Sequence, residues 1–133
     1  MAIDLDARRD PGPQPGRAAR LTLSLDRDGA TCLWCGRAFD HLVAPTTDHL
    51  VPRVKGGPSW LENEAAACRR CNRERGHTSP AAWADECERR GWPVDRPRLV
   101  RALHDLDAAI QRRGGQRRAR GYLAGQLRRL APA

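Results

Sequence analysis

Apolar residues recur every three or four positions in the last third of the chain, separated by charged residues. This spacing predicts two amphipathic helices, over residues 98–112 and 116–130, joined by Gly114 and Gly115. We expect the apolar face of the first helix to pack on the rest of the protein rather than on a partner. That face consists of Leu99, Leu103, Leu106 and Ile110.

Another helix is predicted upstream, over residues 79–90. Ser79 suits its N-cap and Pro80 its first helical position, while a Gly-Trp-Pro sequence follows its predicted end. The segment 17–28 is ambiguous, because its three leucines alternate as in a strand but stand among charged residues. A short helix and a short strand both remain open there, and we favour the helix.

The middle of the chain predicts a hairpin followed by a helix. Residues 46–52 are rich in β-prone side chains, and Pro52 ends this strand. A turn over 55–59 contains two glycines and a proline, and Trp60 begins the return limb. The alanine-rich segment 63–75 predicts the helix.

Composition limits the hydrophobic core. The chain has 133 residues, of which 5% are aromatic, and its mean hydropathy is -0.69. Such a chain buries little apolar surface, so a bound metal would add to its stability. We divide it into a flexible, proline-rich leader over 1–17, a functional module over 18–92 and a basic helical extension over 93–133.

The net charge of +8 indicates a polyanionic partner, most simply nucleic acid. Part of this charge is discounted, because Lys55 is the only lysine and such an excess of arginine is typical of GC-rich coding. No apolar run approaches the ~20 residues of a membrane span, and the first residues lack the features of a secretory signal. The sequence thus predicts a cytoplasmic protein without a membrane partner.

Four of the five cysteines form two C-x-x-C pairs, Cys32 with Cys35 and Cys68 with Cys71. Two intervening residues let both sulfurs of a pair reach one ion at about 2.3 Å, so the four thiolates suit one tetrahedral Zn2+. Buried free thiols or a redox pair are the alternatives, and a structural zinc is favoured over both. The lone Cys87 is predicted to be a partly buried free thiol.

Oxygen and nitrogen donors lie inside and beside the span between the two pairs. Asp48 and His49 are neighbours, and on a strand they point to opposite faces, so that one can bind a cation and the other can meet the attacking water. Asn72 directly follows the last paired cysteine. This carboxylate, imidazole and carboxamide suit a hard divalent cation and a general base, a combination that predicts hydrolysis.

Two runs of sequence, D-H-L-V-P-R-V-K-G-G and W-L-E-N-E-A-A-A-C-R-R-C-N-R-E-R-G, resemble the HNH endonucleases of the ββα-metal (His-Me finger) fold. The resemblance is to the subgroup with a zinc on four cysteines, and it covers roughly residues 26–83. It implies an α+β fold class, a small zinc-stapled module here extended by flanking α-helices. It also implies hydrolysis of DNA phosphodiester bonds to 5′-phosphate and 3′-hydroxyl ends.

The resemblance assigns a role to each of four residues. His49 is the general base, and Asp48 and Asn72 hold the catalytic divalent cation, which is Mg2+, Mn2+ or Ni2+. Asn63 braces the loop and orients the histidine by hydrogen bonding. Asn72 stands where many members have histidine, a variation that the family shares. His77 follows closely enough to approach the metal, but a solvated residue is the favoured interpretation.

Basic residues flank these positions and are expected to hold DNA phosphates, which provides affinity without base reading. A solvated helix face is the alternative. The arginine-rich segment 112–120 is either a second DNA contact or a disordered basic end. Trp34, Trp60 and Trp83 are expected to pack around the zinc module. The expected phosphate contacts are Arg53, Lys55, Arg69, Arg70, Arg73 and Arg75.

Three functions remain open at this point. The first is a small zinc-containing HNH endonuclease that cuts DNA with a divalent cation, which the intact Asp48, His49 and Asn72 favour. The second is a non-catalytic DNA-binding protein built on the same zinc module. The third is a nuclease subunit of a larger phage or restriction assembly, with the C-terminal helices docked on a protein partner.

Overall fold

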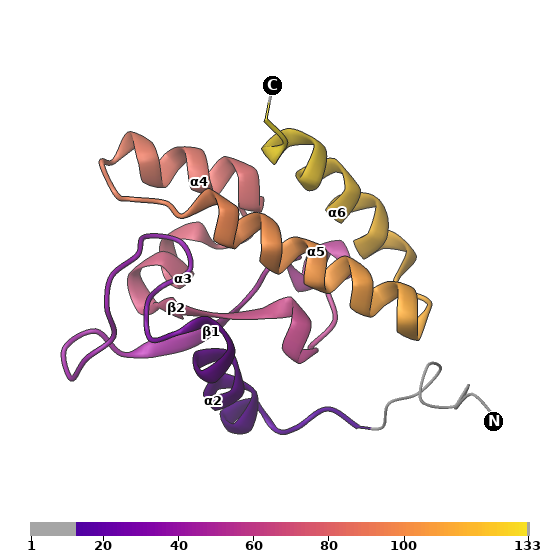
Figure 1. Cartoon of the computed structure of the whole chain (residues 1–133), viewed down its shortest axis with the longest axis horizontal. Coiled ribbons are helices and arrows are strands. Elements are labelled where there is room, and N and C mark those ends of the chain that lie inside the picture. Colours follow the sequence, from indigo (N-terminus) through magenta and orange to yellow (C-terminus); the bar gives the residue numbers. More distant parts are fainter. Residues whose placement is uncertain (1–12, 133) are drawn as a thin grey trace.

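A two-stranded sheet lies between one helix on one side and a layer of C-terminal helices on the other (Figure 1). The computed structural model describes residues 13–132. The α+β class expected from the sequence is confirmed. In chain order, the elements of the described residues are α2 (Arg17–Asp28), β1 (Pro45–His49), the short 3-10 helices η1 (Arg53–Lys55) and η2 (Leu61–Asn63), β2 (Glu64–Cys68), α3 (Arg69–Arg75), α4 (Pro80–Arg89), α5 (Arg96–Arg113) and α6 (Arg117–Leu130).

Helix α2 occupies the ambiguous segment 17–28, so the alternative of a strand there is wrong. Polar contacts hold this helix against the sheet. Arg20 Nε donates to Glu64 Oε1 at 2.8 Å, and Arg27 Nη2 donates to the Glu64 carbonyl at 2.9 Å. Arginines on one face of α2 therefore place the helix across the start of β2.

The predicted leader is described only in its last part. Residues 13–16 form neither helix nor strand, as expected from their prolines and glycine, and residues 1–12 lie outside the described part of the chain. Gln14 Oε1 accepts a hydrogen bond from the Leu61 amide at 2.9 Å. The described end of the leader is thus in contact with the module.

A hairpin forms as expected, but β1 ends at His49 rather than at Pro52, and the return strand begins at Glu64, after η2, rather than at Trp60. They pair antiparallel, with Asp48 opposite Ala65 and His49 opposite Glu64. Residues opposite each other in a sheet share a face, whereas consecutive residues of one strand alternate. The register therefore places the His49 and Glu64 side chains on the same face and Asp48 on the other.

The prediction of a helix over 63–75 is right only from Arg69 onward. The residues before it form strand β2, which is buried along its whole length. Alanine favours helices, but pairing with β1 and burial on both faces outweigh that local preference. Cys68 then caps α3, since its sulfur accepts a hydrogen bond from the Cys71 amide at 3.4 Å.

The three helices predicted for the C-terminal half are confirmed as α4, α5 and α6, and Ser79 caps α4 as expected. The apolar face of α5 is buried, so it offers no apolar surface to a partner. The predicted extension packs on the module through one continuous hydrophobic cluster. Its largest members are Leu33, Trp34, Leu50, Trp83, Leu99, Leu103, Leu106, Ile110, Leu123 and Leu130.

The arginine-rich segment 112–120 spans the end of α5, a glycine turn and the start of α6, so the alternative of a disordered end is wrong. Arg118 Nη2 donates to the Val54 carbonyl at 2.8 Å, which joins α6 to η1. A DNA contact by this segment stays a prediction. No helix within residues 13–132 is long and apolar enough to cross a bilayer.

The tryptophans pack as expected. Trp34 and Trp83 are buried and Trp60 is half-buried. The Arg113 guanidinium lies 4.5 Å from the centre of the Trp60 ring and binds Glu62, which links α5 to η2. Burial of Trp34 leaves no exposed ring face for stacking on a base.

Candidate active site and zinc centre

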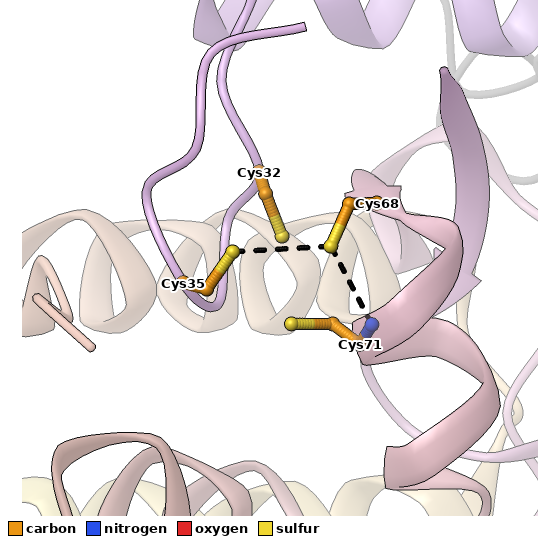
Figure 2. Close-up of side chains that lie close together, drawn as sticks. All are labelled: Cys32, Cys35, Cys68 and Cys71. Carbon is orange, nitrogen blue, oxygen red and sulfur yellow. Dashed lines mark hydrogen bonds between the residues drawn. The ribbon is translucent and has the colours of Figure 1, made fainter. Parts of the chain in front are cut away.

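The four paired cysteines converge between the loop that follows α2 and the start of α3 (Figure 2). Cys32 and Cys35 lie on that loop, where Gly36 adopts a φ of 79° and allows the tight turn. Cys68 and Cys71 come from the β2–α3 junction. The four sulfur atoms all lie within 4.8 Å of one another, so the predicted cluster is present.

A tetrahedral zinc ion fits this cluster. Sulfurs that each lie about 2.3 Å from one Zn2+ are about 3.8 Å apart, and the Cys35 and Cys68 Sγ atoms are 3.8 Å apart. Hydrogen bonds among these close sulfurs lower the pKa of the Cys35 thiol and raise the pKa of the Cys32 and Cys71 thiols. Four sulfur donors leave no open position, as in a structural site.

Cys87 lies outside this cluster, as expected, but it is fully rather than partly buried. The difference arises because the apolar face of α4 packs into the core, where a free cysteine behaves as a small apolar side chain. A hydrogen bond with Cys71 lowers the pKa of the Cys87 thiol. Cys87 is thus a neighbour of the cluster and not a member of it.

Asp48 stands near the end of β1 with one carboxylate oxygen already bound by the protein. Its Oδ2 accepts hydrogen bonds from Trp34 Nε1 at 2.8 Å and from Arg75 Nη1 at 3.0 Å. Its Oδ1 has no hydrogen-bond partner among residues 13–132. The two donors fix the orientation of the carboxylate, as outer partners of a metal ligand do, and leave Oδ1 available to a cation.

Arg75 is 2% exposed, so the expectation that it contacts a DNA phosphate is wrong. Its Nε donates to the Thr78 carbonyl at 2.9 Å, its Nη1 to the His49 carbonyl at 2.6 Å and its Nη2 to the Leu50 carbonyl at 2.8 Å. The guanidinium also lies 4.5 Å from the centre of the Trp34 ring. Its planar guanidinium connects α3 to the end of β1, a role that the sequence did not reveal.

His49 is the last residue of β1, and its side chain is 20% exposed. Its Nε2 lies 3.2 Å from Ser59 Oγ and 3.9 Å from Glu64 Oε2. Burial lowers the pKa of His49 below its usual 6.5, although the carboxylates of Glu64 and Asp48 oppose this shift. The imidazole is therefore mainly neutral at pH 7, which is the form that a general base requires.

Asn72 lies on α3, one position after the last zinc-cluster cysteine. Its Nδ2 donates to the Thr47 carbonyl at 3.0 Å, which ties the helix to the strand next to Asp48. Its Oδ1 has no hydrogen-bond partner in the described structure. Asn72, Asp48 and His49 line the same cleft, so the structure brings the three predicted residues together.

Asn63 is completely buried and braces the loop between the strands, as expected. Its Oδ1 accepts from the Val51 amide at 2.9 Å, and its Nδ2 donates to the Val51 carbonyl at 3.1 Å and the Pro58 carbonyl at 2.9 Å. It makes no hydrogen bond to His49 among the residues described here. The expected hydrogen bond by which Asn63 would orient the histidine is therefore not seen, and its nearest link to His49 is the backbone bond from the Leu50 amide to the Asn63 carbonyl, at 2.8 Å.

Replacing Asn63 with alanine is expected to lower the free energy of unfolding by roughly 3 kcal/mol, because Val51 and Pro58 groups lose buried hydrogen bonds. The loop is closely packed around the Asn63 amide, since a Cβ added at Gly57 would lie 1.8 Å from the Val51 carbonyl oxygen and 2.9 Å from Asn63 Nδ2. Urea denaturation measures the change. Asn72→Ala, which removes one side-chain bond, is the matched control, and an equal loss in both variants would contradict this role of Asn63.

Asp48, His49 and Asn72 line one cleft with a volume of about 330 Å³. It lies where the end of β1 meets α2 and α3. His77 is exposed at this cleft, which agrees with a solvated residue. Both faces of β1 contribute to it, so a substrate across this end meets Asp48 and His49 together. The other charged or hydroxyl side chains that line it are Arg17, Arg20, Thr47, Arg53, Ser59 and Glu64.

Five of these residues were not found from the sequence as site residues: Arg17, Arg20, Thr47, Ser59 and Glu64. Arg17 and Arg20 stand three positions apart, which places them on one face of α2 once that segment is known to be helical. Glu64 was hidden because its segment was assigned to a helix, where it has no relation to His49. No local signal marked Ser59, which belongs to the predicted turn.

The remaining basic candidates lie on elements that border the cleft. Arg53 and Lys55 are exposed on η1, and Arg69 and Arg73 are exposed on α3. Arg70 is half-buried, with its guanidinium 3.6 Å from the centre of the Trp92 ring. Phosphate binding by these residues stays a prediction.

Comparison with known proteins identifies the same region. Residues 32–87 match the family model described as HNH endonuclease. The CRISPR-associated endonuclease Cas9 of Actinomyces naeslundii is 35% identical over 65 residues, which are 48% of this chain and 6% of that protein. The CRISPR-associated endonuclease Cas9 of Corynebacterium diphtheriae is 35% identical over 74 residues, which are 52% of this chain and 7% of that protein.

The fold is similar as well. The crystal structure of the Type II-C Cas9 enzyme from Actinomyces naeslundii matches with a TM-score of 0.53 at 24% identity, over 92% of this chain and 13% of that chain. The present chain thus spans a small part of the length of these relatives. Residues 32–87, which contain the cysteine cluster and the Asp48-His49 step, are thus similar to the HNH endonuclease family, as the sequence indicated.

Proposed function

We propose that the chain is a metal-dependent endonuclease that hydrolyses phosphodiester bonds in DNA and leaves 5′-phosphate ends. The observation that carries this proposal is the convergence of Asp48, His49 and Asn72 in one cleft beside the cysteine cluster. Relatives of the module are named as CRISPR-associated endonucleases, which supports the same activity.

Two oxygen atoms of the cleft suit a hard divalent cation. Asp48 Oδ1 and Asn72 Oδ1 are donors of the kind that Mg2+ and Mn2+ prefer, and Ni2+ accepts them too. A cation bound there would neutralise charge on the scissile phosphate and stabilise the leaving oxygen. The chain prepares both donors, because Trp34 and Arg75 orient Asp48 while the Thr47 carbonyl orients Asn72.

His49 is the general base in this proposal. Its Nε2 lies at the cleft and takes the proton of the water that attacks phosphorus, a contribution of about 10²–10⁴-fold to the rate. Arg17 and Arg53 line the same cleft and suit the phosphates on either side of the cut. A zinc ion bound by the four cysteines would tie the loop after α2 to the β2–α3 junction and would take no part in the chemistry.

Plasmid cleavage tests the proposal directly. Supercoiled DNA is incubated with the purified chain and Mg2+, Mn2+ or Ni2+, and nicked or linear DNA is expected only when a cation is added. Ligase should reseal the nicks without prior treatment with a kinase, because 5′-phosphate ends are substrates for ligation. Intact plasmid with all three cations would contradict the proposal and favour the non-catalytic DNA-binding protein.

The rate of cleavage is expected to rise with pH and to level off above about pH 7. Protonated His49 cannot accept a proton, and burial lowers its pKa below 6.5, so the midpoint of the rise should lie below pH 6.5. Initial rates in buffers from acidic to neutral pH, at saturating cation, measure this midpoint. A midpoint clearly above 6.5 would argue against His49 as the base.

Arg53→Gln is expected to weaken DNA binding and to reduce the slope of log affinity against log salt by about 1, because one phosphate contact is lost. Fluorescence anisotropy of a labelled duplex at several salt concentrations, without added divalent cation, measures the slope. Arg89→Gln removes the same charge from α4, away from the cleft lining, and should leave the slope unchanged. Equal slopes for wild type and Arg53→Gln would exclude this contact.

A nuclease module within a larger assembly is the second candidate. It is favoured by the matched relatives, in which the similar region makes up 6% and 7% of the length. The exposed faces of α5 and α6, which are polar and arginine-rich, are the surfaces left for a partner in that case. Cleavage of plasmid by the isolated chain at nanomolar concentration would show that no partner is required.

A further inference from the structure

Glu64 is a buried acid at the cleft to which the family resemblance assigns no role. It lies opposite His49 in the strand register, and its side chain is 1% exposed. Its Oε1 accepts a hydrogen bond from Arg20 Nε at 2.8 Å. Its Oε2 is buried and has no hydrogen-bond partner within residues 13–132. Native structures rarely leave a buried carboxylate oxygen without a donor, so a missing partner is indicated.

The surroundings of Oε2 indicate what that partner is. His49 Nε2 lies 3.9 Å from it, which is too far for a direct hydrogen bond but within reach of one bridging water. The cleft that both residues line is polar and large enough to hold water. A water placed between an imidazole nitrogen and a carboxylate oxygen has an acceptor for each of its two protons.

We propose that Glu64 is a positioning residue for the nucleophile, and that Oε2 accepts one hydrogen bond from the water that His49 deprotonates. This inference rests on the proposed function. In the step, the water oxygen forms a bond to phosphorus while the bond from phosphorus to the 3′ oxygen breaks. One water proton passes to His49 Nε2, the other stays on the new 5′-phosphate, and the 3′ oxygen takes a proton from solvent.

The ion pair with Arg20 fixes the orientation of the Glu64 side chain. Arg20 reaches the carboxylate from α2, and the ion pair holds Oε1 so that Oε2 stays on the side of His49. Asp48 is held in a comparable way by Trp34 and Arg75. Within residues 13–132, each of these two carboxylates thus has one oxygen bound by the protein and one without a hydrogen-bond partner. The free oxygen of Asp48 suits the cation, and the free oxygen of Glu64 suits the water.

Two variants test this role through different properties of the side chain. Glu64→Gln keeps the length of the side chain, but Arg20 then binds the amide oxygen and the amide NH2 replaces the acceptor next to His49. Glu64→Asp keeps the charge and the partner for Arg20 but withdraws the carboxylate by one methylene. The matched control is Glu62→Gln. Glu62 stands two residues before Glu64, and this change removes its ion pair with Arg113.

Cleavage of a short duplex is measured as kcat and KM, together with Mn2+ affinity by electron paramagnetic resonance and thermal stability. We expect both Glu64 variants to lose about 10²-fold in kcat, because the water is misplaced. KM and Mn2+ affinity should be unchanged, and Glu62→Gln should retain wild-type kcat. If Glu64→Gln does not fold, Glu64→Asp decides alone, since it keeps the ion pair.

Three results would overturn the proposal. Wild-type kcat in Glu64→Asp would show that only the charge matters, and wild-type kcat in both variants would show no role in the reaction. A loss of Mn2+ affinity would make Glu64 a metal ligand instead. If the wild-type chain cleaves DNA and any of these results is found, only this inference is refuted. If the wild-type chain is inactive, the proposed function is refuted and this inference with it.

Discussion

Replacing His49 with alanine is expected to lower the rate of plasmid cleavage by about 10²–10⁴-fold, the usual contribution of a general base. The loss should appear in kcat, because the His49 side chain makes no hydrogen bond, within residues 13–132, to the Asp48 and Asn72 side chains proposed to hold the cation. Its nearest polar contacts are Ser59 and Glu64. Cleavage of supercoiled plasmid, followed on gels at saturating Mg2+ or Mn2+, measures the change.

The control for this prediction is His104→Ala, which removes an exposed histidine from α5, outside the cleft lining. It should cleave at the wild-type rate. Circular dichroism and zinc content should be the same in wild type and both variants, because neither histidine contacts the cysteine cluster. Unaltered cleavage by the His49 variant would remove it as the base.

Replacing Cys68 with serine is expected to abolish zinc binding and to unfold or loosen the module. Structural zinc contributes about 10–16 kcal/mol in small zinc peptides at pH 7, whereas a whole domain is typically stable by only about 5–15 kcal/mol. Cys68 also caps α3, because its sulfur accepts the Cys71 amide. Zinc content, circular dichroism and thermal denaturation measure the effect.

Cys87→Ala is the matched control, because Cys87 is equally buried but stands outside the cluster. It should retain one zinc per chain and lose only the small amount of stability that follows from a missing sulfur atom in the core. A folded, zinc-free Cys68→Ser protein would contradict a structural role of the metal.

The cysteine cluster and the Asp48-His49 step were predictable because their signal is local. The covalent distance across two residues decides that both sulfurs of a C-x-x-C pair reach one ion, and the chain's tertiary contacts do not alter it. The helices α4, α5 and α6 were predictable for a related reason. Their apolar spacing and their caps lie within each segment, and the buried face of α5 is the one that this spacing indicated.

Strand β2 was not predictable from local preference. Its alanines favour a helix, and only the pairing with β1 and burial on both faces make it a strand. The error had a consequence for the site, because Glu64 stands opposite His49 only in a strand. The presence of Glu64 in the cleft therefore depends on contacts between segments that are far apart in the sequence.

Arg75 shows the same limit for charge. Its charge and its place near the site grouped it with the residues expected to hold phosphates, but it is buried and binds Asp48 and the end of β1. The local sequence by itself determined which metal-binding and catalytic groups are present, namely four thiolates, one carboxylate, one imidazole and one carboxamide. Only the tertiary structure decided which of their atoms lack a hydrogen-bond partner, because the residues that provide such partners come from other segments of the chain.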